Sequence, residues 1–184
     1  MITVADKEGT MGKTELRGLR LRQMTKTAVF AALICLTTMF VRIPAPIGYI
    51  HCGDAFIFLG AVAMPFPYSA IAAAIGGAFA DVLSGYGIYA LPTAIIKILN
   101  AACFIGIYNE ASKKLMSKKA VLRGIASGVV TVLGYFITDL LLYGNASAIL
   151  IESVLPNLVQ AVGSLLIFIF AAAAADKSGI MKSK

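Results

Sequence analysis

Three charged residues lie inside apolar stretches of this sequence, and their chemistry needs explaining first. Lys97 lies within LPTAIIKILNAACFIGIY (91–108), and Asp81 and Asp139 lie in two other apolar stretches. A charged side chain at the centre of a bilayer costs from about 2.5 to more than about 10 kcal/mol, so such residues usually face a cavity or a charged partner. The three charges therefore predict a site for a polar ligand. The alternative is an internal salt bridge, most simply between Asp81 and Lys97.

Polar side chains recur at helical spacing in the same stretches. Residues three, four or seven positions apart point to one side of a helix. The side chains grouped in this way are Thr93, Lys97 and Asn100; Tyr135, Asp139 and Tyr143; and Asn157, Gln160 and Ser164. We expect these stripes, together with Asp81, to converge on a polar cavity in the outer half of a helix bundle. Alternatively, they only form hydrogen bonds between helices, worth about 0.6–2 kcal/mol each.

Residues of two glycine-containing loops are expected to cover this cavity. Tyr86 and Tyr89 offer aromatic surfaces on which a ligand ring can stack. His51 is the single histidine, and no cluster of His or Cys accompanies it, so we predict a loop contact and no metal or cofactor. Asp54 begins the next apolar segment, where the helix dipole favours a carboxylate, with a gate contact as the alternative.

The composition is that of an integral membrane protein. Of 184 residues, 59% are hydrophobic and only 14% are charged, against about 45–50% and about 25% in soluble domains. The net charge of +7 does not indicate nucleic-acid binding, because the Lys and Arg residues flank apolar segments without interleaved aromatic residues. The expected fold is therefore all-α, with the chain embedded in the membrane.

Six membrane-spanning helices are predicted. Their ranges are 24–43, 54–64, 68–83, 91–109, 124–143 and 152–175. The segment 54–64 is short for a span, which needs about 20 residues, so its ends must be sheltered by protein. The membrane domain is then 24–175, between an N-terminal tail (1–23) and a C-terminal tail (176–184).

The distribution of basic residues predicts the orientation. The three loops 44–53, 84–90 and 144–151 contain no Lys or Arg, whereas both tails and the segment 110–123 are basic. We expect the protein to lie in the plasma membrane. Because Lys and Arg mark the cytoplasmic side, both termini are expected in the cytoplasm.

Small residues near the start of the first span predict a protein interface. Ala28, Ala32 and Cys35 follow a small-xxx-small spacing, with Ala31 adjacent, which allows another helix to approach closely. The chain has no GxxxxGK[ST] phosphate loop, no HExxH and no GxSxG motif, so no catalytic activity of its own is predicted.

Two segments resemble a known family. The run GDAFIFLGAVAMPFPYSAIAAAIGGAFADVLSGYGIYALPTAIIKILNA (53–101) and PNLVQAVG (156–163) resemble the substrate-binding S components of energy-coupling factor (ECF) vitamin transporters. Within that family the chain is most similar to the riboflavin-type subfamily, which includes hydroxymethylpyrimidine and pyridoxine carriers. The resemblance implies a prokaryotic six-helix subunit that captures a vitamin from outside. It also implies a transmembrane coupling subunit, which contacts the first helix at Ala28, Ala31 and Ala32, and two cytoplasmic ATPases. The loop 44–53 would act as the gate.

These inferences predict a high-affinity vitamin-capture subunit, with a pyridoxine- or hydroxymethylpyrimidine-like ring as the expected substrate. Riboflavin is the alternative substrate, and a stand-alone ion-coupled carrier and a membrane-embedded enzyme or structural subunit are the alternative functions. The predicted ligand contacts are Lys97, Asn100, Asp81, Asn157, Gln160 and Asp139, with Tyr86, Tyr89 and His51 as lid or stacking residues.

Overall fold

Six longer helices form the body of the molecule, which is described here from a computed structural model covering residues 12–108 and 114–178. The long helices are α2 (Lys13–Phe40), α3 (Gly53–Ala63), α4 (Phe66–Leu83), α5 (Ala90–Ala102), α6 (Lys118–Tyr143) and α8 (Leu155–Ser178). The shorter elements are β1 (Arg42–Pro44), β2 (Tyr49–His51), the 3₁₀-helix Gly87–Tyr89, α7 (Ala146–Ile149) and the π-helix Leu150–Val154. The predicted helical class is confirmed.

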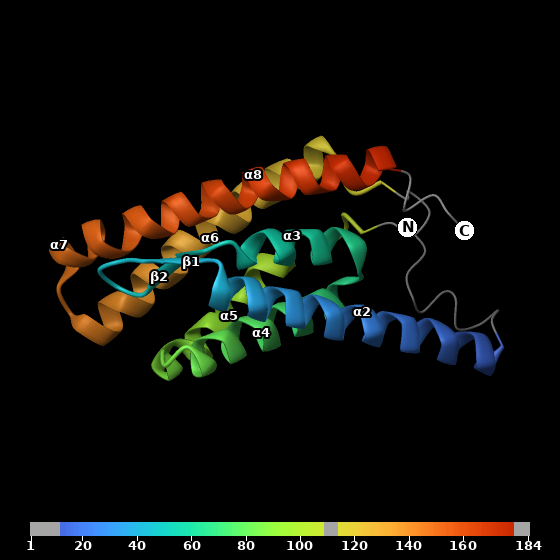
Figure 1. Ribbon diagram of the computed structural model, residues 1–184, viewed down its shortest axis with the longest axis horizontal. Helices are drawn as coiled ribbons and strands as arrows, with labels where there is room; N and C mark the ends of the chain where they lie inside the picture. The colour runs from blue at the N-terminus through green and yellow to red at the C-terminus, as the bar shows by residue number, and fades with distance from the viewer. Residues whose placement is uncertain (1–11, 109–113, 179–184) are drawn as a thin grey trace.

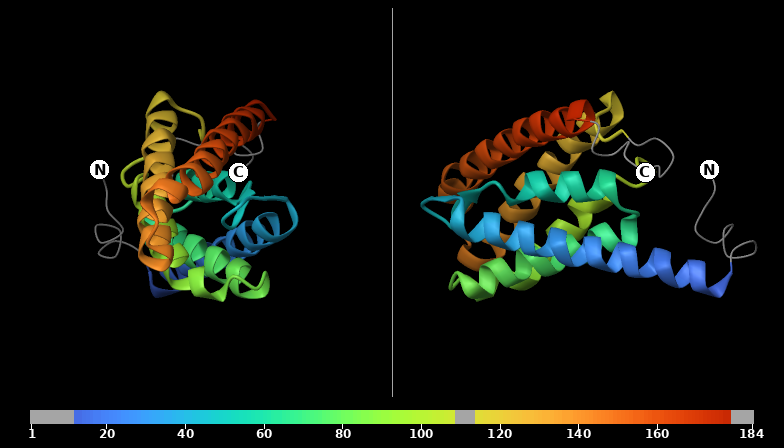
Figure 2. Two further views of the ribbon diagram at one scale, coloured as in Figure 1. Left: turned by 90° about the vertical axis from the view of Figure 1, so that its left-hand side faces the viewer. Right: turned by 45° about the vertical axis from the view of Figure 1, so that its right-hand side comes forward.

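The connections divide between the two ends of an elongated bundle (Figure 1). The β1–β2 pair, the 3₁₀-helix and α7 lie at one end, which we call the hairpin end. The start of α2, the α3–α4 turn, the start of α6 and the end of α8 lie at the other end, called the basic end. The right-hand view of Figure 2 shows the same division from a second direction. The three segments without Lys or Arg, 44–53, 84–90 and 144–151, therefore lie at the same end of the bundle.

Within residues 12–108 and 114–178, four helical segments are long and apolar enough to cross a membrane. They are Glu15–Phe40, Phe66–Leu83, Lys118–Tyr143 and Leu150–Ser178. The segments Gly53–Ala63 and Gly87–Ala102 are apolar but shorter. The prediction that one helix continues over 91–109 is wrong for its second half, because α5 ends at Ala102 and turns follow. Residues 109–113, which include the predicted end of that helix, lie outside the described part.

Two of the predicted loops have regular structure. The segment 44–53, expected as an irregular loop, contributes most of an antiparallel hairpin in which Ile43 pairs with Ile50 and Pro44 with Tyr49. We call residues 42–51 the hairpin. Gly48 takes the left-handed backbone conformation at its turn (φ 71°), which favours glycine. The segment 144–151 likewise contains α7 and the start of the π-helix instead of an open loop.

Close helix packing holds the hairpin end in place. On α4, a Cβ added to Gly76 would lie 2.7 Å from the carbonyl oxygen of Ala31, so α2 and α4 can approach this closely only with glycine there. Toward the basic end, Phe58, Phe104 and Phe168 pack with ring centroids 5.4–6.3 Å apart. These three rings form the aromatic part of the core toward the basic end.

Candidate functional site

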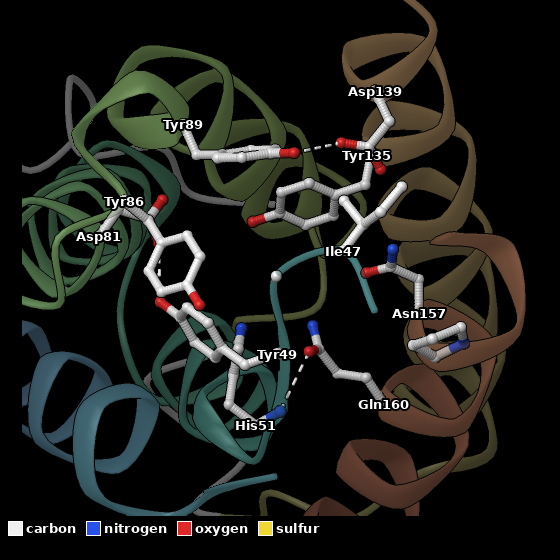
Figure 3. Close-up of a pocket in the computed structure, with 12 residues that line it drawn as sticks. Ile47, Tyr49, His51, Asp81, Tyr86, Tyr89, Tyr135, Asp139, Asn157 and Gln160 are labelled. Atoms are coloured by element: carbon white, nitrogen blue, oxygen red, sulfur yellow. Dashed lines mark hydrogen bonds between the residues drawn. The ribbon is translucent and has the colours of Figure 1, made fainter. Parts of the chain in front are cut away.

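A pocket opens at the hairpin end of the bundle (Figure 3). The cavity measures about 40 Å³, which is smaller than the roughly 300–1,000 Å³ of usual ligand pockets, so a ligand of vitamin size would require the lining to move apart. Its lining is rich in tyrosine, amide and carboxylate side chains from the hairpin and from the ends of α4, α6 and α8. The lining residues are Ile47, Gly48, Tyr49, His51, Asp81, Tyr86, Tyr89, Tyr135, Asp139, Pro156, Asn157 and Gln160.

An ion pair lies beneath this lining. The Nζ atom of Lys97 on α5 donates to Oδ1 of Asp54, in the first turn of α3, at 2.6 Å. Both side chains are only 2% exposed. The ring of Tyr135 lies over the ammonium group, with its centroid 5.2 Å from Nζ. The alternative considered from the sequence, an Asp81–Lys97 salt bridge, does not form: the partner of Lys97 is Asp54, a residue interpreted from the sequence mainly as a helix-start carboxylate.

Gln160 joins this ion pair to the hairpin. Its Nε2 donates to Oδ2 of Asp54 at 3.0 Å, and its Oε1 accepts from the backbone N–H of His51 at 3.2 Å. Figure 3 shows the side chain of Gln160 reaching from α8 toward the hairpin. One amide thus connects α8, α3 and β2 at the bottom of the pocket.

Tyr49 ties the other side of the hairpin to α4. Its hydroxyl donates to Oδ1 of Asp81 at 2.7 Å, and its ring packs edge-on against Tyr86 with centroids 5.1 Å apart. The guanidinium group of Arg42 lies 5.1 Å from the centroid of the same ring. Burial and the carboxylate of Asp81 raise the pKa of Tyr49 well above its ordinary value of 10, so the hydroxyl remains a proton donor.

Asp139 joins three elements to one another at the hairpin end. Oδ1 accepts from the hydroxyl of Tyr89 at 2.6 Å, and Oδ2 accepts a short hydrogen bond from the hydroxyl of Ser153 in the π-helix. The hydroxyl oxygens of Tyr89 and Tyr143 lie 3.2 Å apart, and because the single hydrogen of the Tyr89 hydroxyl is directed to Asp139, Tyr143 is the donor in this contact. Asn157 on α8 in turn donates to the backbone oxygen of Ser153 at 2.9 Å. Both carboxylate oxygens of Asp139 are therefore already engaged within the protein.

His51 is held in its neutral form. Burial lowers the pKa of His51 from 6.5 to about 4. Its Nδ1 accepts a hydrogen bond from the backbone N–H of Gly53 at 3.1 Å, which a protonated nitrogen cannot do. Within the described residues, no group of three or more His, Cys, Asp or Glu side chains is arranged to hold a metal ion.

The predicted ligand contacts divide into two groups. Seven of the nine line the pocket: Asp81, Tyr86, Tyr89, His51, Asp139, Asn157 and Gln160. The other two, Lys97 and Asn100, lie outside this lining; the side-chain amide of Asn100 donates to the hydroxyl of Thr131 at 2.9 Å. Their contact with a ligand remains a prediction.

Two aromatic lining residues, Tyr49 and Tyr135, were missed in the list of predicted contacts. Tyr135 shares the predicted helix face of Asp139, so the periodicity already pointed to it. Tyr49 has no such signal, because only the formation of the hairpin brings it to Asp81.

The three alanines proposed as a partner interface do not share one environment. Ala28 and Ala32, four residues apart on α2, are exposed. Ala31 is buried in the bundle against α4. The available face is therefore the Ala28–Ala32 stripe, and Ala31 belongs to the internal packing.

The sequence matches a known protein family and one relative. The family model described as "ECF-type riboflavin transporter, S component" matches residues 18–177. An uncharacterized protein of Pyrococcus woesei, described as lying in the gap 3′ region, is 34% identical over 136 residues. The match covers 73% of this chain and 88% of that protein.

Proposed function

Because the chain belongs to the family of S components of ECF-type riboflavin transporters, we propose that it captures a small water-soluble vitamin in the pocket at its hairpin end. The family is that of a vitamin-transport subunit and not of an enzyme, as the sequence predicted. The observation that carries the proposal is the pocket itself, in which aromatic and hydrogen-bonding side chains surround a space that the hairpin covers.

The chemistry of the lining fits a flat ring with polar substituents. Tyr49, Tyr86, Tyr89 and Tyr135 supply aromatic faces and hydroxyl groups, and aromatic pairs gain about 0.5–1.5 kcal/mol beyond the area that they bury. Amide groups of Gln160 and other lining residues offer both donors and acceptors. A heteroaromatic vitamin presents the complementary ring atoms and hydroxyl groups.

Two substrates satisfy this description, and they differ in size. The family description names riboflavin, and four tyrosines in the lining offer the stacking surface that its large ring needs. The smaller pyridoxine- or hydroxymethylpyrimidine-like ring is the substrate predicted from the sequence. Binding measurements with both classes decide between them.

The proposed topology has six membrane crossings with the basic end in the cytoplasm. Four helices are long enough to cross alone, and α3 and α5 complete the bundle beside them. Among the described residues, the hairpin end carries Arg42 as its one exposed cation, whereas the basic end carries the remaining exposed Lys and Arg side chains. The positive-inside rule then places the pocket outside the cell, where a vitamin is captured.

The proposed partners are a transmembrane coupling subunit and two cytoplasmic ATPases. The exposed Ala28–Ala32 stripe on α2 offers the coupling subunit a face that it can approach closely. Energy for uptake would come from these partners, so the chain alone would bind its vitamin without transporting it.

The test is to purify the chain alone in mild detergent and to examine it by native mass spectrometry. We expect a stoichiometric adduct with the mass of a vitamin, and calorimetric titration with riboflavin and with pyridoxine then ranks the two ring classes. Asn157→Leu, which alters the pocket lining, should weaken the binding. Val162→Leu, on the lipid-facing side of the same helix, should not.

Two results would contradict the proposal. A ligand-free protein that binds no member of a vitamin panel would exclude a capture subunit. Uptake into liposomes driven by an ion gradient without ATPases would instead establish the stand-alone carrier.

A further inference from the structure

The buried pair of Asp54 and Lys97 needs a role of its own, because neither residue lines the pocket. The Nζ atom of Lys97 lies 2.6 Å from Oδ1 of Asp54, so the two charges neutralise each other, and both side chains are buried. The link between the pair and the pocket is Gln160, which does belong to the lining and contacts Asp54 directly.

The direction of the Gln160 amide decides whether the hairpin is held. An amide has two N–H donors on nitrogen and two acceptor lone pairs on oxygen. In the observed orientation the oxygen accepts from the His51 backbone N–H and the nitrogen donates to Asp54. If the amide turned over, its NH₂ group would face the backbone N–H of His51, a second donor, and its oxygen would face the carboxylate of Asp54, a second acceptor. The carboxylate of Asp54 therefore selects the orientation that binds the hairpin.

Lys97 allows this carboxylate to remain in place. A buried carboxylate without a partner is strongly disfavoured, and removing one member of a buried ion pair is more damaging than replacing both. The ammonium group donates to Oδ1 of Asp54, and Oδ2 is free to accept from Gln160. The Tyr135 ring beside Nζ gives the cation a second favourable contact.

We propose that Asp54 and Lys97 are positioning residues: they orient Gln160, and through it they hold the hairpin closed over the ligand. This inference rests on the proposed capture function and assigns the ion pair a part in it. In the present orientation, one N–H and one lone pair of Gln160 remain for the ligand. Ligand recognition and hairpin closure therefore share a single side chain.

The test compares single replacements with a charge-free pair. Lys97→Met keeps the approximate length of the side chain but strands the Asp54 carboxylate. The double variant Asp54→Asn/Lys97→Met removes both charges and retains an oxygen that accepts from Gln160. Lys97→Arg, which keeps the charge, is the conservative control. Two quantities are measured on the full chain in detergent: the affinity for riboflavin and pyridoxine, and the hydrogen–deuterium exchange of residues 49–52 without ligand.

We expect Lys97→Met to weaken binding at least about tenfold, the equivalent of one lost hydrogen bond to a charged group, and to accelerate exchange of the hairpin. The double variant should recover both quantities to within about threefold of the wild type. The exchange measurement reports on this contact directly, because the backbone N–H of His51 that donates to Gln160 lies within the measured segment.

Three outcomes overturn the inference. If the folded double variant regains slow exchange but does not bind, Lys97 contacts the ligand directly. If its hairpin exchanges as fast as that of Lys97→Met, the pair does not position Gln160. If Lys97→Met changes neither quantity, the pair is irrelevant to closure. A wild-type protein that binds neither vitamin would count against the proposed function, while the ligand-free exchange data would still decide the role of the pair.

Discussion

Replacing Tyr49 by phenylalanine removes one hydroxyl group that fastens the hairpin to α4. The bond from this hydroxyl to Asp81 is 2.7 Å long and has a charged acceptor, and such hydrogen bonds contribute about 1.5–3 kcal/mol. Since about 1.4 kcal/mol corresponds to a factor of ten in an equilibrium constant, the ratio of closed to open hairpin should fall about 10- to 150-fold. The ring contacts with Tyr86 and Arg42 would remain.

The assay is the rate at which a bound vitamin dissociates from the purified chain, followed by stopped-flow mixing. An open hairpin releases the ligand, so Tyr49→Phe should raise the dissociation rate about tenfold or more. Tyr86→Phe is the matched control, because among the described residues the Tyr86 hydroxyl has no hydrogen-bond partner while its ring makes the same aromatic contact. An unchanged rate in Tyr49→Phe, or an equal rise in both variants, would refute the assignment of this bond to closure.

Three further outcomes are expected. Because the pKa of His51 is about 4 in the folded protein and 6.5 ordinarily, its stabilising effect is complete above about pH 6.5. The free energy of unfolding should then fall by about 3 kcal/mol as the pH is lowered from 6.5 to 4. Melting curves should show this pH dependence for the wild type and not for His51→Gln. Ala32→Trp, on the exposed face of α2, should abolish uptake with the complete transporter while vitamin binding to the isolated chain persists. Gly76→Ala should lower stability by about 1–3 kcal/mol because its Cβ would meet α2, whereas Gly163→Ala, with no atom within 4 Å, should be neutral or stabilising in the same melting experiment.

Periodicity located the polar faces but could not identify their partners. The spacing of Asn157 and Gln160 correctly placed both side chains on the pocket side of α8. It could not show which carboxylate reaches Lys97, because that depends on how α3, α4 and α5 pack. Asp54 occupies the first turn of α3, where a carboxylate is favourable on local grounds alone. The sequence therefore offered a sufficient local reason for Asp54, and its ion pair with Lys97 was not predicted.

The family resemblance read from residues 53–101 is confirmed by the family match over 18–177. The hairpin was beyond reach because each of its strands has three residues, too few for an alternating pattern to appear, and its prolines and glycine indicate a loop equally well. The overlong prediction for 91–109 has a different cause. The apolar run continues past Ala102, but Gly106 takes a left-handed conformation in the turns that follow the helix.

The pocket and the shortness of two helices have a common origin. At 1.5 Å per residue, the 11 residues of α3 extend about 16 Å, roughly half the thickness of a bilayer's hydrocarbon core. The rest of that depth is available to the hairpin, whose last strand leads directly into Gly53. A Cβ at Gly53 would lie 2.1 Å from the hydroxyl of Thr38, so only glycine lets α3 begin this close to α2.

The first turn of α3 consequently lies inside the protein, with Asp54 facing Lys97 and Gln160 instead of lipid. Backbone that is not helical is tolerated within a bilayer only where protein or a cavity surrounds it. The strand β2 meets this condition, since its residues are half-buried or buried, whereas β1 is exposed. A longer α3 that spanned the bilayer alone would fill the space in which the ligand is proposed to bind. We therefore infer that the shortness of α3 is the structural basis of the proposed binding site.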